Sequence, residues 1–406
     1  MNSTINDFLV KHSLSESAID IQALCDYFIS EMNAGLEKRP SSLAMINSYC
    51  NPVEKVPAGE KVIVIDAGGT NLRTCLISFD ESGNSILEDF RKTHMPGIGK
   101  KISAKDFFSV FADETERLID KSDRIGFCFS YAAEILPDHD GVPVSLSKEI
   151  NAPEVVGKRL GKELLTELEK RGFDVSKKKI IILNDTVSTL LAGISKVEEL
   201  GCEGCIGFIL GTGTNTAYIE GKTIINEESG NFNLALGDID EAFLSSTLEP
   251  KKYRFEKMIS GKYLGPGCLF VLKQAQKEEL ISSRTTLPEN LISADVTSFL
   301  KGGKSALDTL DATDRETIEK LIKAYIRRTS RLVAANLAAS VLKTGYGKEK
   351  PVLINADGST FYFVPGLKEQ TEACLSAFLR EKGRSAVFTQ IENSPAIGSA
   401  IGALSI

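Results

Sequence analysis

The sequence predicts an α/β protein built of two lobes, and three observations support this fold class. Short runs rich in β-branched residues, such as 62–65 and 125–129, alternate with amphipathic stretches of helical period. A pattern of strand, Gly-rich turn and strand occurs at Asp66–Asn71 and again at Gly211–Asn215, about 145 residues further on. The chain of 406 residues is long enough for two such units. Two related lobes with a ligand in the cleft between them are therefore expected.

The elements are expected in the following order. Residues 1–58 are predicted to be largely helical and to end in loops at Asn51-Pro52 and Pro57-Ala58-Gly59. Continuous apolar or β-branched runs predict strands at 62–65, 72–79, 125–129, 179–183, 205–210, 216–219 and 352–356. Helical periodicity predicts helices over 103–121, 153–172, 186–192, 314–343 and after Pro395.

Composition and charge exclude several classes of function. The net charge of −7 argues against a nucleic-acid partner, because phosphate-binding surfaces are usually basic. No run of 18 apolar residues predicts a membrane span, and the N-terminus lacks the basic and apolar regions of a signal peptide. We therefore expect a cytoplasmic protein with reduced cysteines. Cys202 and Cys205 form a CxxC pair, but no histidine is near in sequence, which favours packing residues over a metal site.

The two Gly-rich turns are the first candidate site. Consecutive N–H groups and the hydroxyl of Thr70 can bind phosphate oxygens, and Asp66 at the strand end can hold Mg²⁺ through water. Each turn alone can also be an ordinary β-hairpin, but the occurrence of two copies favours phosphate binding. Neither a P-loop nor a Rossmann fingerprint is present.

Asp185 is the second candidate, in the segment Leu183-Asn184-Asp185-Thr186. An acid between a buried strand and a helix can be a helix N-cap. It can also be a general base for a substrate hydroxyl, since phosphoryl transfer needs positioning and one carboxylate, but an N-cap is the commoner role for such an acid. The residues by themselves leave both readings open.

Six segments together resemble the hexokinase family. VIDAGGTNLR is similar to the first phosphate motif, usually DLGGTNFR, and FILGTGTNTAYIE to the second. LNDTVSTLLAG resembles the sugar-binding and first connecting segment, and FEKMISGKYLG the start of the next sugar-contacting helix. NADGSTFYFVPGL resembles the adenosine motif and SPAIGSAIGAL the second connecting helix. The matches follow the family's order over roughly residues 60–405, so the resemblance is specific.

The resemblance implies two ribonuclease H-like (actin-like) lobes and a role for each matching residue. It implies a small lobe of 61–183 plus 395–406, a large lobe of 184–394, and N-terminal helices in 1–60 that pack on the large lobe. It implies ATP-dependent phosphorylation of a hexose at the 6-hydroxyl, with glucose as the leading candidate and Asp185 as the base. The implied sugar ligands are Ser130, Ser147, Lys148, Asn184, Asn215 and Glu228. The implied residues for ATP and Mg²⁺ are Asp66, Gly68, Gly69, Thr70, Asn71, Arg73, Gly211, Thr212, Gly213, Thr214, Asp357, Gly358 and Ser359, with Asp66 reaching the metal through water.

The chain also departs from the family pattern. Pro266 follows Ser260–Gly265, where the resemblance implies a sugar-binding Glu, and the chain contains no Trp. The family's FSFP is here Phe129-Ser130-Tyr131-Ala132. Loss of charged hydrogen bonds at Pro266 is expected to cost roughly 10- to 100-fold in sugar affinity unless another group substitutes. Mannose, fructose and modified hexoses therefore stay open as substrates.

Two other functions remain possible on the same fold. A catalytically inactive sugar sensor would explain Pro266, although such a protein need not keep Asp185 and both phosphate turns. An actin-like or chaperone-like ATPase would turn over ATP without sugar. The set of residues implied to bind sugar favours the kinase.

Overall fold

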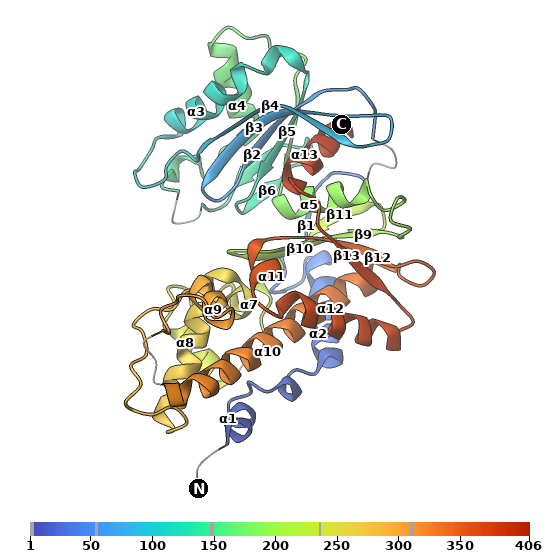
Figure 1. The fold of residues 1–406 in the computed structure, drawn as a ribbon. Helices are drawn as coiled ribbons and strands as arrows, with labels where there is room; N and C mark the ends of the chain where they lie inside the picture. Colours follow the sequence, from blue (N-terminus) through green and yellow to red (C-terminus); the bar gives the residue numbers. More distant parts are fainter. Residues whose placement is uncertain (1–3, 53–55, 147–149, 235–236, 309–311) are drawn as a thin grey trace.

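Two β-sheets organise the protein, as the sequence predicts for the fold class. The structure is a computed structural model that describes residues 4–52, 56–146, 150–234, 237–308 and 312–406. A five-stranded sheet and a six-stranded sheet lie at different heights in Figure 1, with helices on both faces of each. We call the first sheet with its outer helices the small lobe and the second sheet with its helices the large lobe. The predicted division of the chain into 1–60, 61–183 plus 395–406, and 184–394 stays a proposal.

The small lobe is a mixed sheet in the order β4-β3-β2-β5-β8. Ile63 and Ile65 of β2 face α3 and α4, whereas Val62 and Val64 face α5 and α13. This alternation of side chains is what a strand buried on both faces requires. The bounds are β2 Val62–Ala67, β3 Asn71–Phe79, β4 Ser85–His94, α3 Ala104–Glu116, β5 Arg124–Phe129, β6 Ala133–Ile135, β7 Gly141–Pro143, α4 Leu160–Lys170 and β8 Lys179–Leu183.

The large lobe is a sheet in the order β1-β11-β10-β9-β12-β13. The 33-residue helix α10 packs beneath this sheet together with α2 and α12, and α1 lies at the far end (Figure 1). The bounds are α1 Ile5–Lys11, α2 Ile21–Leu36, β1 Ile46–Asn47, β9 Cys205–Leu210, β10 Thr214–Glu220, β11 Thr223–Asn226, α6 Asp238–Ser245, α7 Arg254–Ile259, α8 Gly261–Lys277, α9 Ser293–Leu300, α10 Ala312–Thr344, β12 Val352–Asp357, α11 Ser359–Phe363, α12 Leu367–Glu381 and β13 Ala386–Thr389.

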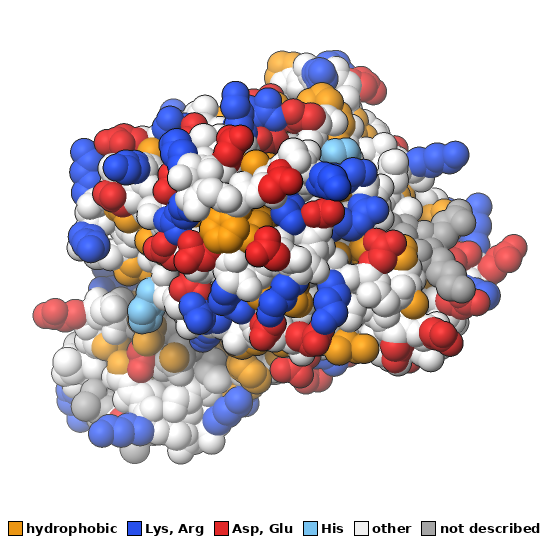
Figure 2. All heavy atoms as spheres, turned by 90° about the horizontal axis from the view of Figure 1, so that it is seen from above, with side chains coloured by type: hydrophobic (Ala, Val, Ile, Leu, Met, Phe, Trp, Pro, Cys, Tyr) orange, Lys and Arg blue, Asp and Glu red, His pale blue; other side chains and the backbone are white. Residues whose placement is uncertain are grey.

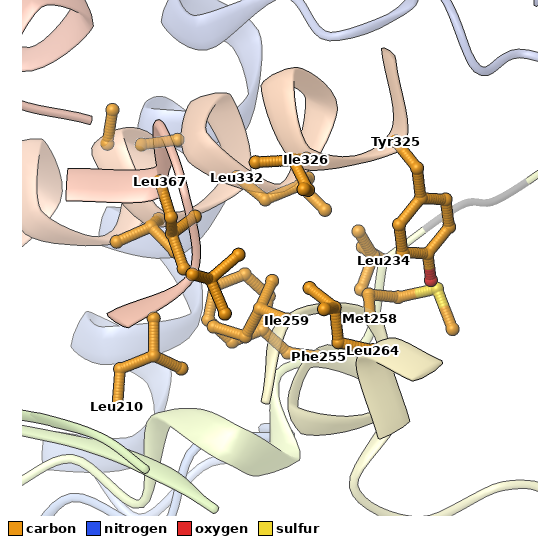
Figure 3. Close-up of a cluster of buried hydrophobic side chains, with 14 of the residues drawn as sticks. Leu210, Leu234, Phe255, Met258, Ile259, Leu264, Tyr325, Ile326, Leu332 and Leu367 are labelled. Carbon is orange, nitrogen blue, oxygen red and sulfur yellow. The ribbon is translucent and has the colours of Figure 1, made fainter. Parts of the chain in front are cut away.

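A buried apolar cluster supports the second Gly-rich turn from below. Leu210 is the last residue of β9, directly before Gly211, and its side chain is fully buried. Figure 3 shows it near side chains that converge from α7, α8, α10 and α12. The packed side chains include Phe255, Met258, Ile259, Leu264, Tyr325, Ile326, Leu332 and Leu367. Dense packing of this kind holds the turn in one position, because a core of interlocking side chains resists deformation.

Two short helices, α5 (Asp185–Ile194) and α13 (Ser394–Leu404), lie between the sheets (Figure 1). They cross with almost no space, since a Cβ added to Gly398 would lie 1.7 Å from the Ser188 carbonyl oxygen. The hydroxyls of Ser188 and Ser399 are 2.9 Å apart at the same crossing. Small residues in the last helix therefore permit close helix packing at the junction of the lobes.

Two of the expected helices differ from the prediction. In residues 37–58 the described part contains no helix, and Lys38, Met45 and Tyr49 have positive φ angles, which are incompatible with one. The expected helix over 153–172 is interrupted at Gly157, with φ of +81°, and α4 begins only at Leu160. The other predicted strands and helices are present with shifts of a few residues at their ends.

The surface of the small-lobe end carries both signs of charge. Figure 2 shows Lys and Arg interspersed with Asp and Glu over this face, with small apolar areas between them. Within the described ranges, none of the helices combines the length and apolar character needed to cross a bilayer. The expectations of no nucleic-acid partner and of a cytoplasmic location stay predictions.

Candidate active site

The predicted site residues lie at the carboxyl ends of parallel strands. In the small lobe, β2, β5 and β8 are parallel neighbours, and they end at Asp66, Ser130 and Asn184-Asp185 respectively. In the large lobe, β9 and β12 are parallel and end at Gly211 and Asp357. Carboxyl ends of parallel strands meet at one edge of a sheet, where α/β proteins bind ligands.

These two edges face one another across a cleft. One cavity is lined from the small lobe by Phe129 and Tyr131 and from the large lobe by Asn226 and Glu228. A second cavity is lined by Asp66, Arg73 and Asp357. Of the predicted sugar residues, Asn184 and Glu228 thus line the first cavity, and three of the predicted ATP and metal residues line the second.

Asp185 is the first residue of α5, and it is not the N-cap of that helix. Asn184 is the cap, since its Oδ1 accepts from the Thr186 N–H at 2.9 Å. The Asp185 carboxylate accepts instead from the hydroxyls of Ser130 and Thr186, the latter at 3.2 Å. Burial raises the pKa of Asp185 to about 6, against these hydrogen bonds and together with the negative charges of Glu228 and Asp66. The capping reading of Asp185 is therefore wrong, and its carboxylate is bound by two hydroxyls close to Glu228 and Asp66.

Asp66 ends β2 almost fully buried and is paired with Arg73. Arg73 Nη1 donates to Asp66 Oδ2 at 2.6 Å. Burial raises the pKa of Asp66 above its usual value, and Asp357 across the cleft adds to this, whereas Arg73 opposes it. Arg73 is thus the partner that stabilises the ionised form of this buried carboxylate.

Three amides and one acid form a continuous chain across the cleft. Asn215 Nδ2 donates to Asn226 Oδ1 at 2.7 Å and lies 3.4 Å from Asn184 Oδ1. Asn226 Nδ2 donates to Glu228 Oε1 at 2.8 Å. Glu228 has φ of +55°, and this left-handed turn directs the chain back after β11. The structure thereby brings together Asn184, Asn215 and Glu228, which lie far apart in the sequence, and adds Asn226, which the sequence analysis missed.

Glu256 is a second residue that sequence reasoning missed. It lies in α7, and its Oε2 accepts from the Thr214 N–H at 3.1 Å. Burial raises the pKa of Glu256 to about 7, opposed by the Thr214 N–H and Lys262, and the charge of Glu228 adds to the increase. Its position in FEKMISG, inside a segment that resembles a sugar-contacting helix, was the available signal.

Thr214 is consequently unsuited to the phosphate role expected for it. Its N–H is taken by Glu256, and its hydroxyl donates to the Ile209 carbonyl at 2.9 Å. Both donors face the protein interior, so they are not available to a ligand.

The rest of the second turn is held by α8 and by the predicted adenosine motif. Gly261 N–H donates to the Gly211 carbonyl at 2.8 Å, and Lys262 N–H donates to the Thr212 carbonyl at 3.1 Å. Gly358 has φ of +112°, and a Cβ there would lie 2.6 Å from the Gly211 nitrogen. Only glycine fits this close approach, which brings Asp357, Gly358 and Ser359 against the turn.

The remaining predicted residues fall into three groups. Gly68, Gly69, Thr70 and Asn71 form the first turn, in which the Asn71 amide donates to the Thr70 hydroxyl at 3.0 Å. Thr212 and Gly213 complete the second turn. Ser147 and Lys148 lie outside the described residues. Pro266 lies inside α8 and lines neither interlobe cavity.

The donor set of the cleft fits a nucleotide-bound Mg²⁺ better than a metal held by protein alone. Asp66 and Asp357 supply carboxylate oxygens, the ligands that Mg²⁺ prefers. In the described part of the chain, however, no three His, Cys, Asp or Glu side chains cluster as metal ligands. Mg²⁺ with few protein ligands usually keeps waters and takes phosphate oxygens of its nucleotide, which agrees with this arrangement.

Comparisons with known proteins relate the chain to sugar kinases. Two family models, each described as hexokinase, match residues 5–195 and 205–405. Hexokinase-7 of Oryza sativa subsp. japonica is 28% identical over 428 aligned residues, covering 92% of this chain and 90% of its own. A glucokinase of Aspergillus niger is 27% identical and covers 86% of each chain.

A solved structure shows the same fold. The hexokinase of Schistosoma mansoni complexed with glucose superposes with a TM-score of 0.76 and 22% identity, covering 99% of both chains. The expected fold of two actin-like lobes is confirmed by this likeness, and the expected enzyme class is confirmed by the family matches. Because the two family models together span almost the entire sequence, the protein belongs to the hexokinase family and is a hexose kinase.

Proposed function

We propose that the protein transfers the γ-phosphoryl group of ATP to the 6-hydroxyl of a hexose, with glucose as the leading substrate. The observation that carries this proposal is the position of Asp185. Its carboxylate accepts from the hydroxyls of Ser130 and Thr186, and it lies near enough to Glu228 and Asp66 for their charges to help raise its pKa to about 6. A carboxylate with this pKa is ionised at neutral pH and still basic enough to accept a proton from a hydroxyl.

The reaction follows from this arrangement. Asp185 takes the proton of the sugar hydroxyl while the hydroxyl oxygen bonds to the γ-phosphorus. The bond from that phosphorus to the β–γ bridging oxygen breaks, and ADP leaves with the bonding electrons. N–H groups of the two turns, Arg73 and a Mg²⁺ ion near Asp66 would stabilise the charge on the transferred group, which is where phosphoryl transfer needs most help.

The sugar is proposed to bind through paired hydrogen bonds. Asn184, Asn215 and Glu228 form one side of its site, and Ser130 forms the other. Ser147 and Lys148, which the resemblance also implies as sugar ligands, lie outside the described residues. Asn226 orients the Glu228 carboxylate through the 2.8 Å hydrogen bond described above. Amides and carboxylates suit this task because each sugar hydroxyl both donates and accepts.

The resemblance implies a sugar-binding Glu at position 266, where this chain has proline. Glu256 is proposed to take over that role. Its carboxylate is close enough to Glu228 for their charges to interact. A catalytically inactive sugar sensor, which Pro266 favours, is the second candidate function.

The test is an ADP-release assay with Mg·ATP over glucose, mannose, fructose, galactose, glucosamine and N-acetylglucosamine. Turnover with at least one sugar, far above the rate without sugar, is expected. A rate that no sugar raises, together with measurable sugar binding, would favour the sensor. A high rate without sugar would favour an ATPase.

A further inference from the structure

Tyr131 connects the sugar side of the cleft to the first Gly-rich turn. It directly follows Ser130 and is almost fully buried, with its ring 5.1 Å from that of Phe129. Its hydroxyl lies 2.9 Å from the Gly69 carbonyl oxygen and 3.2 Å from the Gly68 carbonyl oxygen. One O–H donor is therefore shared by two successive carbonyls of the turn.

Because peptide bonds are planar, this contact also fixes the directions in which two N–H groups point. The Gly68 carbonyl shares a peptide with the Gly69 N–H, and the Gly69 carbonyl shares one with the Thr70 N–H. The described chain has no cis peptide, and in a trans peptide the carbonyl and the N–H point in opposite directions. Since both carbonyls point to Tyr131, both N–H groups point away from it.

Those two N–H groups are available to a ligand. Among the described residues, neither the Gly69 nor the Thr70 N–H donates to a backbone oxygen outside regular secondary structure. Gly69 and Thr70 are exposed, and a Cβ added to Gly69 would meet nothing within 4 Å. Two successive N–H groups that point into open space form a site for an anionic oxygen.

We propose that Tyr131 is a positioning residue that orients the N–H groups of Gly69 and Thr70 toward the phosphates of the nucleotide. This inference rests on the proposed function, which places ATP at this turn. Tyr131 also lines the cavity that contains Asn184 and Glu228, and it adjoins Ser130, which hydrogen-bonds Asp185. A sugar that orders this side of the cleft would therefore also order the turn, so that sugar binding strengthens nucleotide binding.

The experiment removes only the hydroxyl, with Tyr131→Phe. The phenylalanine ring keeps the packing of the tyrosine ring. If Tyr131 only filled space, the substitution would therefore leave the affinity for phosphate ligands unchanged. Affinity is measured by calorimetry with Mg·AMPPNP and with inorganic tripolyphosphate, each with and without saturating sugar, and sugar affinity is measured alone. Losing one hydrogen bond that preorganises the turn is expected to weaken both phosphate ligands about three- to tenfold. Sugar affinity should stay within about twofold of the wild type, and the gain in nucleotide affinity caused by sugar should shrink.

Tyr218→Phe is the matched control, because it also removes a buried tyrosine hydroxyl, one that bonds Glu220 on β10. It should leave the affinity for Mg·AMPPNP unchanged. The inference is overturned if Tyr131→Phe binds both phosphate ligands as the wild type does, or if sugar and phosphate affinity fall equally. Binding of tripolyphosphate needs no turnover, so the inference can be judged even if no sugar is phosphorylated and the proposed function fails.

Discussion

Nη1 of Arg73 lies 2.6 Å from Oδ2 of Asp66, so a partly exposed cation is paired with a buried carboxylate at the end of β2. Burial raises the pKa of Asp66, and the charge of Arg73 opposes this increase. The ionised form of Asp66 is therefore favoured by a neighbour seven residues away in the chain. In the proposed mechanism the ionised form is needed near Mg²⁺.

Replacing Arg73 by Gln is expected to weaken the use of Mg·ATP more at low pH than at high pH. Without the guanidinium, the pKa of Asp66 rises further, and protonation removes its negative charge as the pH falls. The KM for Mg·ATP at pH 6.5 relative to pH 8.5 measures this effect. Arg73→Lys keeps the charge and should show a smaller change in that ratio. An identical ratio in wild type and Arg73→Gln would contradict the role given to the pair.

Replacing Asp185 by Asn is expected to reduce kcat by about 10²- to 10⁴-fold, because the amide cannot accept the proton. The side chain keeps its shape, so sugar affinity should change little. Steady-state kinetics and sugar titration measure the two quantities separately. A variant that retains more than roughly a tenth of the wild-type rate would rule out the base assignment.

The pH dependence of wild-type turnover should show an acidic limb near pH 6, set by Asp185. The base acts in its ionised form, so kcat/KM should fall as the pH drops below the pKa of about 6 and level off above it. This limb should be missing from the residual activity of Asp185→Asn. A flat profile of the wild type down to pH 5 would exclude Asp185 as the titrating base.

The same pKa has the opposite consequence for stability. Because the pKa of Asp185 is higher in the folded chain than its usual 3.8, its ionisation opposes folding, and stability falls as the pH rises from about 4 through 6. Asp185→Asn should therefore be more stable than the wild type at pH 8, by about 1–3 kcal/mol, and equally stable below pH 4. Chemical denaturation at the two pH values measures the difference. A variant less stable than the wild type at pH 8 would contradict the argument.

Glu256 and Pro266 can be separated by a pair of substitutions. Glu256→Gln is expected to raise the KM for the sugar about 10- to 100-fold, because a carboxylate close to Glu228 is lost. Pro266→Glu is expected to change that KM less than about threefold, since residue 266 lines neither cavity. A sugar KM lowered tenfold or more by Pro266→Glu would show that Pro266 does weaken sugar binding, as the resemblance implies.

Gly398→Ala tests the contact between the two central helices. The added methyl group would overlap the Ser188 carbonyl, with the Cβ 1.7 Å from its oxygen, so α5 and α13 would have to separate. Overpacking of this kind costs about 1–3 kcal/mol. Urea denaturation measures the loss. Unchanged stability would show that the helices can move apart freely.

Local signals in the chain predicted much of the scaffold. The buried runs at 62–65 and 205–210 are strands, and the long period-3.6 stretch is α10. The prediction was wrong for 37–58 because short-range helix propensity competes there with tertiary contacts. One example is β1, whose Ile46 pairs with Asn226 at a separation that no local pattern reveals.

The sequence by itself determined the fold class, the two Gly-rich turns and the candidate base, because each depends on residues adjacent in the chain. Only the tertiary structure decided what surrounds them. It paired Glu256 with Thr214, withdrew the Thr214 donors from the cleft, and placed the Tyr131 hydroxyl on the Gly68 and Gly69 carbonyls. Glu256 is 42 residues from Thr214, and Tyr131 is 62 and 63 residues from Gly69 and Gly68. The energies that select such pairs come from burial and close packing of separate elements, which periodicity along one segment cannot encode.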